Sequence, residues 1–563
     1  MYIKEIKIKN FRGLDIEIDN IKSKLLIMGR NDTGKSNICY ALKKLFDVNT
    51  RRIPFTDSDS TNNNCGTIFI SAKLMLDNIS YIERSSIGKY IDVKNGDEYI
   101  NISLNAEYNK DLMIYEETII LGDTDETRFA SNRSIPIDDI LELVYVEPNY
   151  NLEQNSKNYF RKKKKENEKN ERIIGNSVLD KTRSLNDSIK SDEIVHEMVD
   201  SINNNGNFDE IFEDISFDIQ SNIAVDNIYA SLNFMASDNE GHSIKALGDG
   251  KTKTLSLLLK NDSLDVDKHK IFILEEPENH MYPLLQKTYL ELCQNLNLDQ
   301  IFVTTHSPYI FDFKKMEQIV RLKKNGKITR QNSININEDT YKKFGYLLNE
   351  EIGEILFYDK VLLVEGVSEK YFYNTLFNTD DKFRHYVTEN KMGIFSVGGV
   401  DFYPVKDFLE KLGITVYIKT DNDIFKVPKM NLKRYAGIER VLNCLDSSSK
   451  TKLANLLGTK ELDKELFRFS LNDDSKKIIE DNLVEIQNIF EDNRVYLSIS
   501  HEGFEYDFLE FIESDNIDDK DMEFLKKAKL KNLHEYVIEQ QIPIMITEKN
   551  KDSILVRFMN DFK

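Results

Sequence analysis

The chain has few of the features that mark secreted, membrane-spanning or zinc-binding proteins. It has only four cysteines in 563 residues, without the spacing of a metal site or of a disulfide framework. They are Cys39, Cys65, Cys293 and Cys444. No apolar run approaches the roughly 20 residues of a membrane span, so we expect no membrane partner. Residues 1–4 lead directly into a strand pattern, so we expect no secretory signal and a reducing, cytoplasmic setting.

Positive charge is also scarce. The 76 lysines and arginines do not balance the 96 acidic residues, and the net charge is −20. This argues against a protein that coats nucleic acid, which needs a basic surface. It leaves room for an enzyme acting on nucleic acid, because metal ions and local patches set the field at a site. The length permits roughly three or four domains.

Two pairs of carboxylates in the last third of the chain follow apolar runs that we expect to be buried strands. Glu365 follows the run 361–364, and Glu369 lies one helical turn later. The second pair, Asp421 and Asp423, follows another such run. An open α/β sheet carries its chemistry at the carboxyl ends of its strands. Four converging acids repel unless cations separate them, so this pattern predicts a Mg²⁺ or Mn²⁺ site acting on phosphodiesters.

The residues between the two pairs alternate between strand and helix patterns. The run 395–399 ends in two glycines that allow a tight turn, and Phe402, Val405 and Leu409 then fall at helical spacing. This order resembles the Toprim domain of topoisomerases, primases and nucleases. No tyrosine stands in a topoisomerase context and no zinc ribbon supports a primase, so hydrolysis is the simpler outcome. The alternative is that the acids are merely solvated at strand ends.

A third acidic set follows the apolar run 494–498 and contains Glu502, Glu505 and Asp507. A basic residue that stabilises a pentavalent phosphorane could come from residues 524–530. Surface acids and lysines are common in a chain this charged, so the residues alone leave these roles open.

The N-terminal half contains a complete phosphate-binding loop. Residues 29–36 read G-x-x-x-x-G-K-S, between an apolar strand and a helix pattern. Backbone N–H groups face the phosphates, Lys35 reaches the β- and γ-phosphates, and Ser36 holds Mg²⁺. This segment therefore predicts a site for ATP with Mg²⁺. Its predicted binding residues are Gly29, Asn31, Gly34, Lys35, Ser36 and Asn37.

Three further motifs fit the same ATPase. The strand pattern 270–274 ends in Glu275, expected to support Mg²⁺, and Glu276, expected to polarise the attacking water. His306 ends the strand pattern 301–305 and is placed to contact the γ-phosphate. An isolated histidine would more often be structural, and its place in this series favours the functional role. A signature-like loop opens a later helix pattern with Gly248, Asp249 and Gly250.

The order of these motifs resembles ABC ATPases of the SMC, RecF and OLD type. The resemblance implies an α/β fold with paired nucleotide domains, and therefore a homo-oligomer. Glu275 stands where most ABC proteins have Asp, and the signature reads L-G-D-G-K. We therefore expect slow hydrolysis, with the nucleotide acting more as a sensor. Four segments follow from this reading: an ATPase domain over 1–150 and 221–345, a helical insertion for dimerisation over 151–220, and a Rossmann-like Toprim domain over 346–563.

An ATPase fused to a Toprim domain resembles the OLD nuclease family, in particular its branch from Gabija anti-phage systems. The segments 364–370, 397–399, 412–415 and 418–423 carry this resemblance. It implies a nucleotide-restrained enzyme that nicks double-stranded DNA, a tetramer built as a dimer of dimers, and a UvrD/Rep-like (GajB-like) helicase partner. The alternatives are a RecF- or SMC-like repair ATPase and a stand-alone OLD nuclease.

The resemblance also implies specific site residues. Lys529 would be the catalytic lysine, with Lys527 as the alternative, and Glu502 competes with Glu505. The basic run 161–165 is either a solvated face or a DNA contact. The metal-binding acids would be Glu365, Glu369, Asp421, Asp423, Glu505 and Asp507. The catalytic residues would be Glu365, Asp421, Asp423, Asp507 and Lys529.

Overall fold

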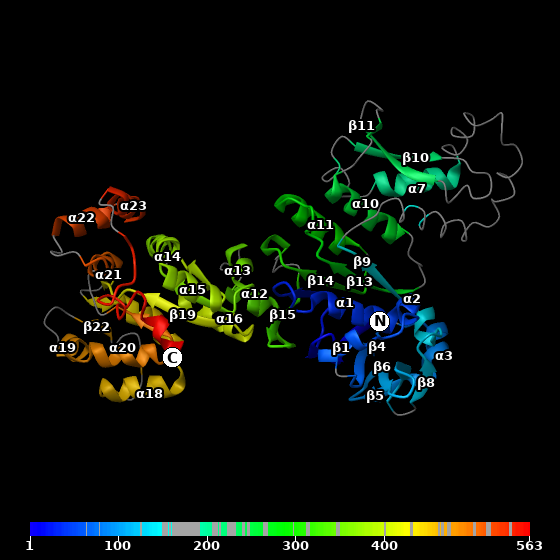
Figure 1. Ribbon diagram of the computed structural model, residues 1–563, viewed down its shortest axis with the longest axis horizontal. Helices are drawn as coiled ribbons and strands as arrows, with labels where there is room; N and C mark the ends of the chain where they lie inside the picture. Colours follow the sequence, from blue (N-terminus) through cyan, green and yellow to red (C-terminus); the bar gives the residue numbers. More distant parts are fainter. Residues whose placement is uncertain are drawn as a thin grey trace, which may run out of the picture. The chain divides into compact units, whose positions relative to one another are not determined.

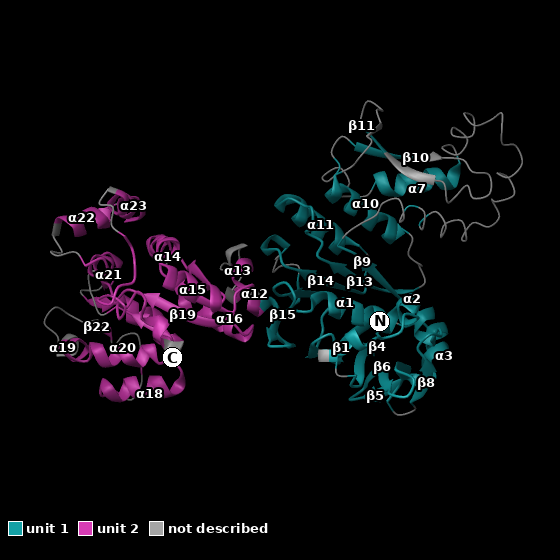
Figure 2. Ribbon diagram, viewed as in Figure 1, with its two compact units in different colours: residues 1–338 teal, residues 339–563 magenta. Residues whose placement is uncertain are grey.

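The chain divides into two compact units, residues 1–338 and 339–563, close to the predicted boundary at 345 (Figures 1 and 2). The computed structural model describes all residues except 64, 78, 124–125, 149–155, 157–158, 160–191, 205–211, 213–214, 222–231, 239–242, 245–247, 263–267, 297, 311–315, 345–349, 399–400, 428–431, 460–461, 463–466, 470–473, 499–502, 514–518, 528, 540–542 and 563. The basic run 161–165 and Glu502 lie outside the described residues.

The first unit is built on a 13-stranded sheet within the described residues. Its strand order is β8-β7-β6-β4-β1-β2-β16-β15-β3-β14-β13-β9, with β5 paired to β6. The strands are β1 (Tyr2–Phe11), β2 (Leu14–Ile18), β3 (Lys24–Met28), β4 (Ile68–Met75), β5 (Asp92–Lys94), β6 (Asp97–Asn109), β7 (Ile114–Leu121), β8 (Thr127–Ala130), β9 (Leu141–Val146), β13 (His269–Glu275), β14 (Gln300–Thr305), β15 (Gln318–Asn325) and β16 (Ile328–Asn335).

The part of this sheet that carries the nucleotide motifs is parallel. β3 pairs in parallel with β14 and β15, and β13 pairs in parallel with β14 and β9. These strands are nearly continuous apolar runs, as expected for a sheet buried on both faces. The helices of the unit are α1 (Lys35–Phe46), α2 (Val48–Arg51), α3 (Tyr81–Ile87), α7 (Glu193–Asn203), α10 (Asp249–Asp262) and α11 (Pro283–Asn295).

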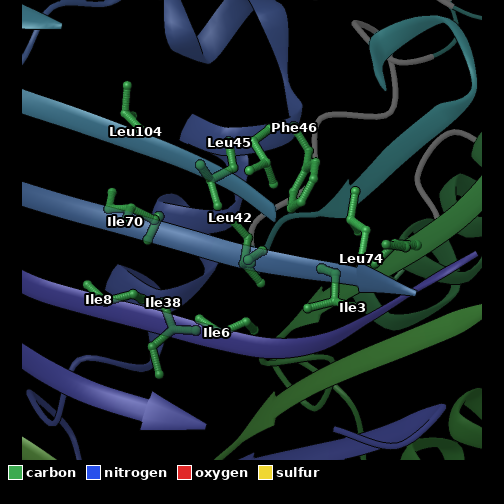
Figure 3. Close-up of a cluster of buried hydrophobic side chains, with 14 of the residues drawn as sticks. Ile3, Ile6, Ile8, Ile38, Leu42, Leu45, Phe46, Ile70, Leu74 and Leu104 are labelled. Carbon is green, nitrogen blue, oxygen red and sulfur yellow. The ribbon is translucent and has the colours of Figure 1, made fainter. Parts of the chain in front are cut away.

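Helix α1 packs its apolar face against the antiparallel part of the sheet. Ile38, Leu42 and Leu45 fall at i, i+4 and i+7, so they share one face of the helix. Figure 3 shows them beside Ile6 of β1 and Ile70 of β4, in one cluster of buried side chains. Burial of a side chain of this size contributes about 1.5–3 kcal/mol, so this cluster fixes the helix that follows the phosphate-binding loop.

The end of the predicted helical insertion differs from the expectation. Residues 215–221 form strand β10 (Ile215–Ser221), which pairs antiparallel with β11 (Leu232–Asp238), and β12 (Ser243–Ile244) follows. The physical reason is the period of two in this segment, where Phe217 and Ile219 are buried and alternate with polar residues. Helix α7 agrees with the helical expectation.

The second unit has a four-stranded parallel sheet in the order β18-β17-β19-β23. These strands are β17 (Lys360–Val364), β18 (Met392–Ser396), β19 (Thr415–Thr420) and β23 (Val495–Leu497). Its core has its own aromatic cluster, which includes Phe372, Tyr373, Phe508 and Phe558. The α/β architecture predicted for both halves of the chain is confirmed.

Helices and short strands surround this sheet in sequence order. They are α12 (Glu338–Phe344), α13 (Glu350–Ile355), α14 (Val367–Thr379), α15 (Asp381–Glu389), α16 (Phe402–Lys411), β20 (Ile424–Lys426), β21 (Lys433–Tyr435), α17 (Ala436–Val441), α18 (Ser447–Leu456), β22 (Arg468–Phe469), α19 (Asp474–Asp481), α20 (Leu483–Glu491), α21 (Phe504–Phe511), α22 (Asp519–Lys527) and α23 (Lys529–Glu539). None of the described helices is both long and apolar enough to cross a membrane.

Candidate metal and nucleotide sites

The parallel strands β17 and β19 bring the two predicted acid pairs to the same edge of the sheet. Val364 and Lys419 are register partners, so Glu365 and Asp421 both leave the sheet at its carboxyl end. The hydroxyl of Thr420 donates a hydrogen bond to Oε2 of Glu365 at 3.3 Å. The same carboxylate forms an ion pair with Arg440 of α17. The sheet therefore makes neighbours of residues that are over 50 positions apart in the sequence.

Asp421 and Asp507 share one buried lysine. Nζ of Lys419 lies 3.0 Å from Oδ1 of Asp421 and 3.1 Å from Oδ2 of Asp507. Burial alone lowers the pKa of Lys419, but the adjacent Asp421 and Asp507 outweigh it and hold that pKa above its usual value. Burial also raises the pKa of Asp507, although Lys419 opposes this. The lysine thus remains charged inside the acid cluster.

Three of the acids converge on Gly503, the residue before α21. A Cβ atom at this position would lie 3.2 Å from Oδ1 of Asp423, 3.2 Å from Oε2 of Glu505 and 3.7 Å from Oδ2 of Asp421. Gly503 also has a φ of +83°, a conformation that residues with a side chain rarely adopt. A glycine here leaves a space lined by three carboxylates.

Burial and crowding shift the acids toward their protonated forms. Burial and the nearby Asp421 raise the pKa of Glu369 to about 7. Burial, Asp421 and Glu365 raise the pKa of Asp423 to about 6. Carboxyl groups that resist ionisation in a cluster are those that a divalent cation stabilises in the ionised form.

Lys529, at the start of α23, stands beside this cluster. Its Nζ lies 3.5 Å from Oε1 of Glu505, and its side chain is 62% exposed. Burial lowers the pKa of Lys529, but Glu505 and Asp421 raise it more. The alternative, Lys527, pairs with Glu523 on its own helix at 3.2 Å. The geometry therefore brings Lys529, rather than Lys527, to the acids.

The acid cluster fits a divalent cation in the chemistry of its donors. It offers carboxylate oxygens, the ligands that Mg²⁺ and Mn²⁺ prefer, around the space at Gly503. Oε1 of Glu505 is buried and accepts no hydrogen bond from the described residues. As the side chains stand, the described part of the chain has no group of three or more Asp, Glu, His or Cys already arranged to hold a metal. Basic side chains pair with several of these acids instead.

Sequence reasoning missed four residues of this cluster: Lys419, Arg440, Gly437 and Gly503. Gly437 at the start of α17 touches the Asp421 backbone so closely that an added Cβ would lie 1.8 Å from its carbonyl oxygen. A lysine inside an apolar strand was the available signal for Lys419. The other three lie far from the motifs in sequence, and only the fold brings them to the acids.

The nucleotide motifs also meet at the carboxyl ends of neighbouring parallel strands. Gly34 caps α1, and Nζ of Lys35 donates to the carbonyls of Gly29 and Arg30 at 2.9 and 3.3 Å. Burial lowers the pKa of Lys35. The predicted residues Asn31 and Ser36 lie in the same loop and first turn, both exposed. The Asn37 side chain donates to the carbonyl of Arg12 at 3.1 Å.

Glu276 joins the loop lysine to the histidine of the next strand. Its Oε1 lies 4.0 Å from Nζ of Lys35 and 3.4 Å from Nδ1 of His306. The hydrogen bond with His306 lowers the pKa of Glu276 and raises that of the histidine. Glu276 also has a φ of +43°, which is unusual for a residue with a side chain and concentrates at functional sites.

Two residues that the sequence did not single out hold the acids of β13. The hydroxyl of Tyr145 on β9 donates to Glu275. Nζ of Lys253 on α10 donates to the carbonyl of Glu276 at 2.7 Å and to that of Pro148 at 3.3 Å. Burial lowers the pKa of Lys253 to about 8.

The signature-like loop opens α10, as predicted. Gly248 and Asp249 are exposed and Gly250 is buried. Oδ2 of Asp249 lies 3.3 Å from Nδ1 of His280. Lys253, one turn further along the helix, therefore connects this loop to the carbonyl of Glu276.

Two family models match the chain. Residues 1–311 match the AAA ATPase domain, and residues 356–423 match the TOPRIM domain of proteins like overcoming lysogenization defect protein. The chain is also 26% identical over 565 aligned positions to Endonuclease GajA of Bacillus cereus (strain VD045), covering 95% of each chain.

Solved SMC heads are similar to part of the chain. The SMC head domain from Thermotoga maritima matches at 14% identity with a TM-score of 0.33, covering 60% of this chain and 100% of its own. The Pyrococcus furiosus Smc head domain bound to the C-terminal domain of ScpA matches at 14% identity with a TM-score of 0.38, covering 61% and 99%.

Proposed function

The chain belongs to the AAA ATPase domain family, and from this premise we propose that it is a metal-dependent DNA endonuclease whose activity is regulated by nucleotide. The TOPRIM match, and the likeness to a protein named an endonuclease, support phosphodiester hydrolysis in the second unit. The observation that carries the proposal is the convergence of Asp421, Asp423 and Glu505 on the space at Gly503. Such a set of oxygen donors suits the cation that phosphodiester hydrolysis requires.

The acids have distinct places in the proposed centre. Bound divalent cations would supply an activated water and neutralise charge on the leaving 3′ oxygen. Asp421 and Asp423 contribute carboxylates from the loop after β19, and Glu365 contributes one from β17. The residues proposed to hold metal are Glu365, Glu369, Asp421, Asp423, Glu505 and Asp507.

Lys529 is proposed to stabilise the negative charge on the phosphorus oxygens during the reaction. Its ammonium stands 3.5 Å from Glu505, and most of its side chain faces solvent. A DNA phosphate that approaches the acids would therefore meet a positive charge at the rim of the cluster. This is the residue role that best explains a lysine beside acids that would otherwise repel DNA.

Nucleotide at the phosphate-binding loop is proposed to restrain the nuclease. Lys35, Glu276 and His306 are in mutual contact, and they are the groups that face a γ-phosphate in such loops. Mg²⁺ would accompany ATP, with Ser36 and Glu275 as its protein ligands. A bound γ-phosphate would compete with Glu276 for Lys35, which changes the pairing of the β13 acids. This gives the site a means to report nucleotide.

The remaining expectations are proposals that extend the resemblance. We propose that the chain acts in the bacterial cytoplasm as part of an anti-phage defence. We propose that it nicks double-stranded DNA as a homo-oligomer, a tetramer built from two dimers, with a UvrD/Rep-like helicase as partner. Helix α7 and the rest of the region 151–220 would contribute to dimerisation.

The nuclease proposal is tested with a supercoiled plasmid and Mg²⁺. Glu365→Ala and Asp421→Ala are expected to lose nicking by about a hundredfold or more, as for residues that bind reacting groups. Glu389→Ala, on the exposed face of α15, is the matched control and should nick as wild type does. Undiminished nicking in both site variants would remove the metal-site proposal and favour a repair ATPase.

The sensor proposal is tested by titrating ATP against nicking. Wild type is expected to be inhibited, and Lys35→Ala is expected to escape inhibition, because its loop no longer pairs with the phosphates. A Lys35→Ala variant that ATP inhibits as strongly as wild type would show that nucleotide acts elsewhere.

A further inference from the structure

Lys419 is an unusual residue for its position. It lies on β19, inside a parallel sheet, and its side chain is 1% exposed. Lysine is almost never fully buried unless it is paired, because removing an ammonium group from water is costly. Here both partners are acids of the proposed metal centre, Asp421 and Asp507.

The protein itself supplies hydrogen bonds to all four oxygens of these two acids. Oδ1 of Asp421 and Oδ2 of Asp507 accept from Lys419 at 3.0 and 3.1 Å. Oδ2 of Asp421 accepts from the backbone N–H of Phe504 at 2.7 Å, and Oδ1 of Asp507 accepts from the hydroxyl of Ser498 at 2.8 Å. A cation entering between the two acids would have to displace the ammonium group.

The acids around Gly503 differ in this respect. Asp423 and Glu505 direct one oxygen each at the space beside Gly503, and Oε1 of Glu505 accepts no hydrogen bond among the described residues. The cluster therefore has a closed pair, Asp421 and Asp507 with Lys419 between them, and an open group that adds Asp423 and Glu505. Oδ2 of Asp421, 3.7 Å from the same point, connects the two.

We propose that Lys419 is a built-in counter-ion that takes the place of a second divalent cation between Asp421 and Asp507. The proposal rests on the proposed metal-dependent function and deepens it. The ammonium group holds the two carboxylates at a fixed separation, and it directs the divalent ion to the open group around Gly503. Asp507 is then a positioning residue, which acts through Lys419 and Asp421.

The test counts Mn²⁺ ions on the full chain without nucleotide, by calorimetry and by electron paramagnetic resonance of free Mn²⁺. Wild type and Asp507→Asn are both expected to bind about one ion per chain, whereas a two-metal centre would bind about two. Glu505→Gln is expected to weaken binding by about tenfold or more, because it removes a charged ligand from the open group. This comparison does not depend on any change at Lys419.

Changes at Lys419 give a second, positive readout. Lys419→Ala opens the position between two charged acids, and it is expected to bind about one ion more than wild type. Lys419→Met fills the same space without charge and should keep the wild-type count. The double variant Lys419→Ala/Asp507→Asn should also return to that count, because the new site has lost a ligand. Circular dichroism and thermal unfolding establish that each variant is folded.

Two results would overturn the inference. One is a wild-type chain that binds two ions and loses one of them in Asp507→Asn. The other is a folded Lys419→Ala variant that binds no additional ion. A wild-type chain that binds no Mn²⁺ and nicks normally as Glu365→Ala and Asp421→Ala would instead refute the proposed function itself.

Discussion

At the scale of single residues, the proposed centre is a balance between acids that repel and bases that separate them. Lys419, Arg440 and Lys529 each pair with an acid of the cluster. The carboxyls left with less compensation, Glu369 and Asp423, have raised pKa values. Protons and divalent cations therefore compete for the same oxygens.

This competition predicts a pH dependence. With the pKa of Glu369 at about 7, nicking should rise between pH 6 and 8 as that carboxyl ionises. The midpoint should move to lower pH as Mn²⁺ is raised, because the cation displaces the proton. In Glu369→Gln, the rise should move toward about pH 6, where Asp423 titrates. A midpoint that does not respond to Mn²⁺ would contradict this assignment.

The sign for stability is opposite to that for activity. A raised pKa means that the folded chain holds the proton of Glu369 more tightly than the unfolded chain does. Without metal, the free energy of unfolding should therefore fall as pH rises from about 4.5, the ordinary glutamate value, to about 7. Added Mn²⁺ should reverse this loss, which urea titrations at several pH values would measure.

Gly437 supports the position of Asp421 by close approach. Replacing a helical glycine by alanine ordinarily stabilises a protein by about 1 kcal/mol. At Gly437 the new Cβ would overlap the backbone of Asp421, so we expect Gly437→Ala to destabilise by about 3 kcal/mol or more and to lose nicking. Gly88→Ala has open space around it and is the control, with a change of less than about 1 kcal/mol. Equal stability of the two variants in urea would contradict the close packing.

At the scale of elements, the parallel strands decide which motifs meet. β3, β14 and β13 place Lys35, His306 and Glu276 at one edge, and α10 then holds that edge through buried Lys253. The helix that carries the signature-like loop is thereby tied to the loop after β13. Such a tie is expected to pass changes between the two.

The burial of Lys253 makes α10 sensitive to pH. Its pKa of about 8 in the folded chain lies below the ordinary 10.5, so the folded chain gives up this proton first as pH rises. Stability relative to Lys253→Met should therefore increase between pH 7 and 10, by about 2–3 kcal/mol. Urea unfolding of the two proteins measures this difference, and Lys251→Met on the same helix is the control. Parallel stability curves would show that Lys253 is not buried as a charged group.

At the scale of the whole molecule, the two units have separate apolar cores and separate chemistry. The core around α1 belongs to residues 1–338, and the aromatic cluster around Phe372 belongs to residues 339–563. A unit of more than 200 residues with its own core is large enough to fold alone. The nucleotide groups lie in the first unit and the acids in the second.

This separation predicts the behaviour of a fragment. Residues 339–563 alone should unfold in one cooperative transition and bind Mn²⁺ with an affinity within about tenfold of the full chain. Nicking by this fragment should no longer respond to ATP, because the phosphate-binding loop is absent. Calorimetry, Mn²⁺ titration and plasmid nicking measure the three properties. A fragment that is unfolded, or that ATP still inhibits, would contradict the separation.

The sequence by itself determined the elements and the residues at their ends. The strands before Glu365, Asp421, Glu275 and His306, and the loop before α1, could be predicted because apolar runs and glycines act through local backbone geometry. The domain order could be predicted for the same reason. Strand β10 escaped because its period of two lies inside a polar segment with a helical character.

Only the tertiary structure decided which side chains share a site. Lys419 faces Asp507, Arg440 faces Glu365 and Tyr145 faces Glu275, each across strands or helices that are distant in the sequence. Such pairs depend on sheet order and register, which no local pattern encodes. The physical reason is that charges buried together must be neutralised by whatever group the fold brings within a few ångströms, and the fold here brings a lysine between two acids.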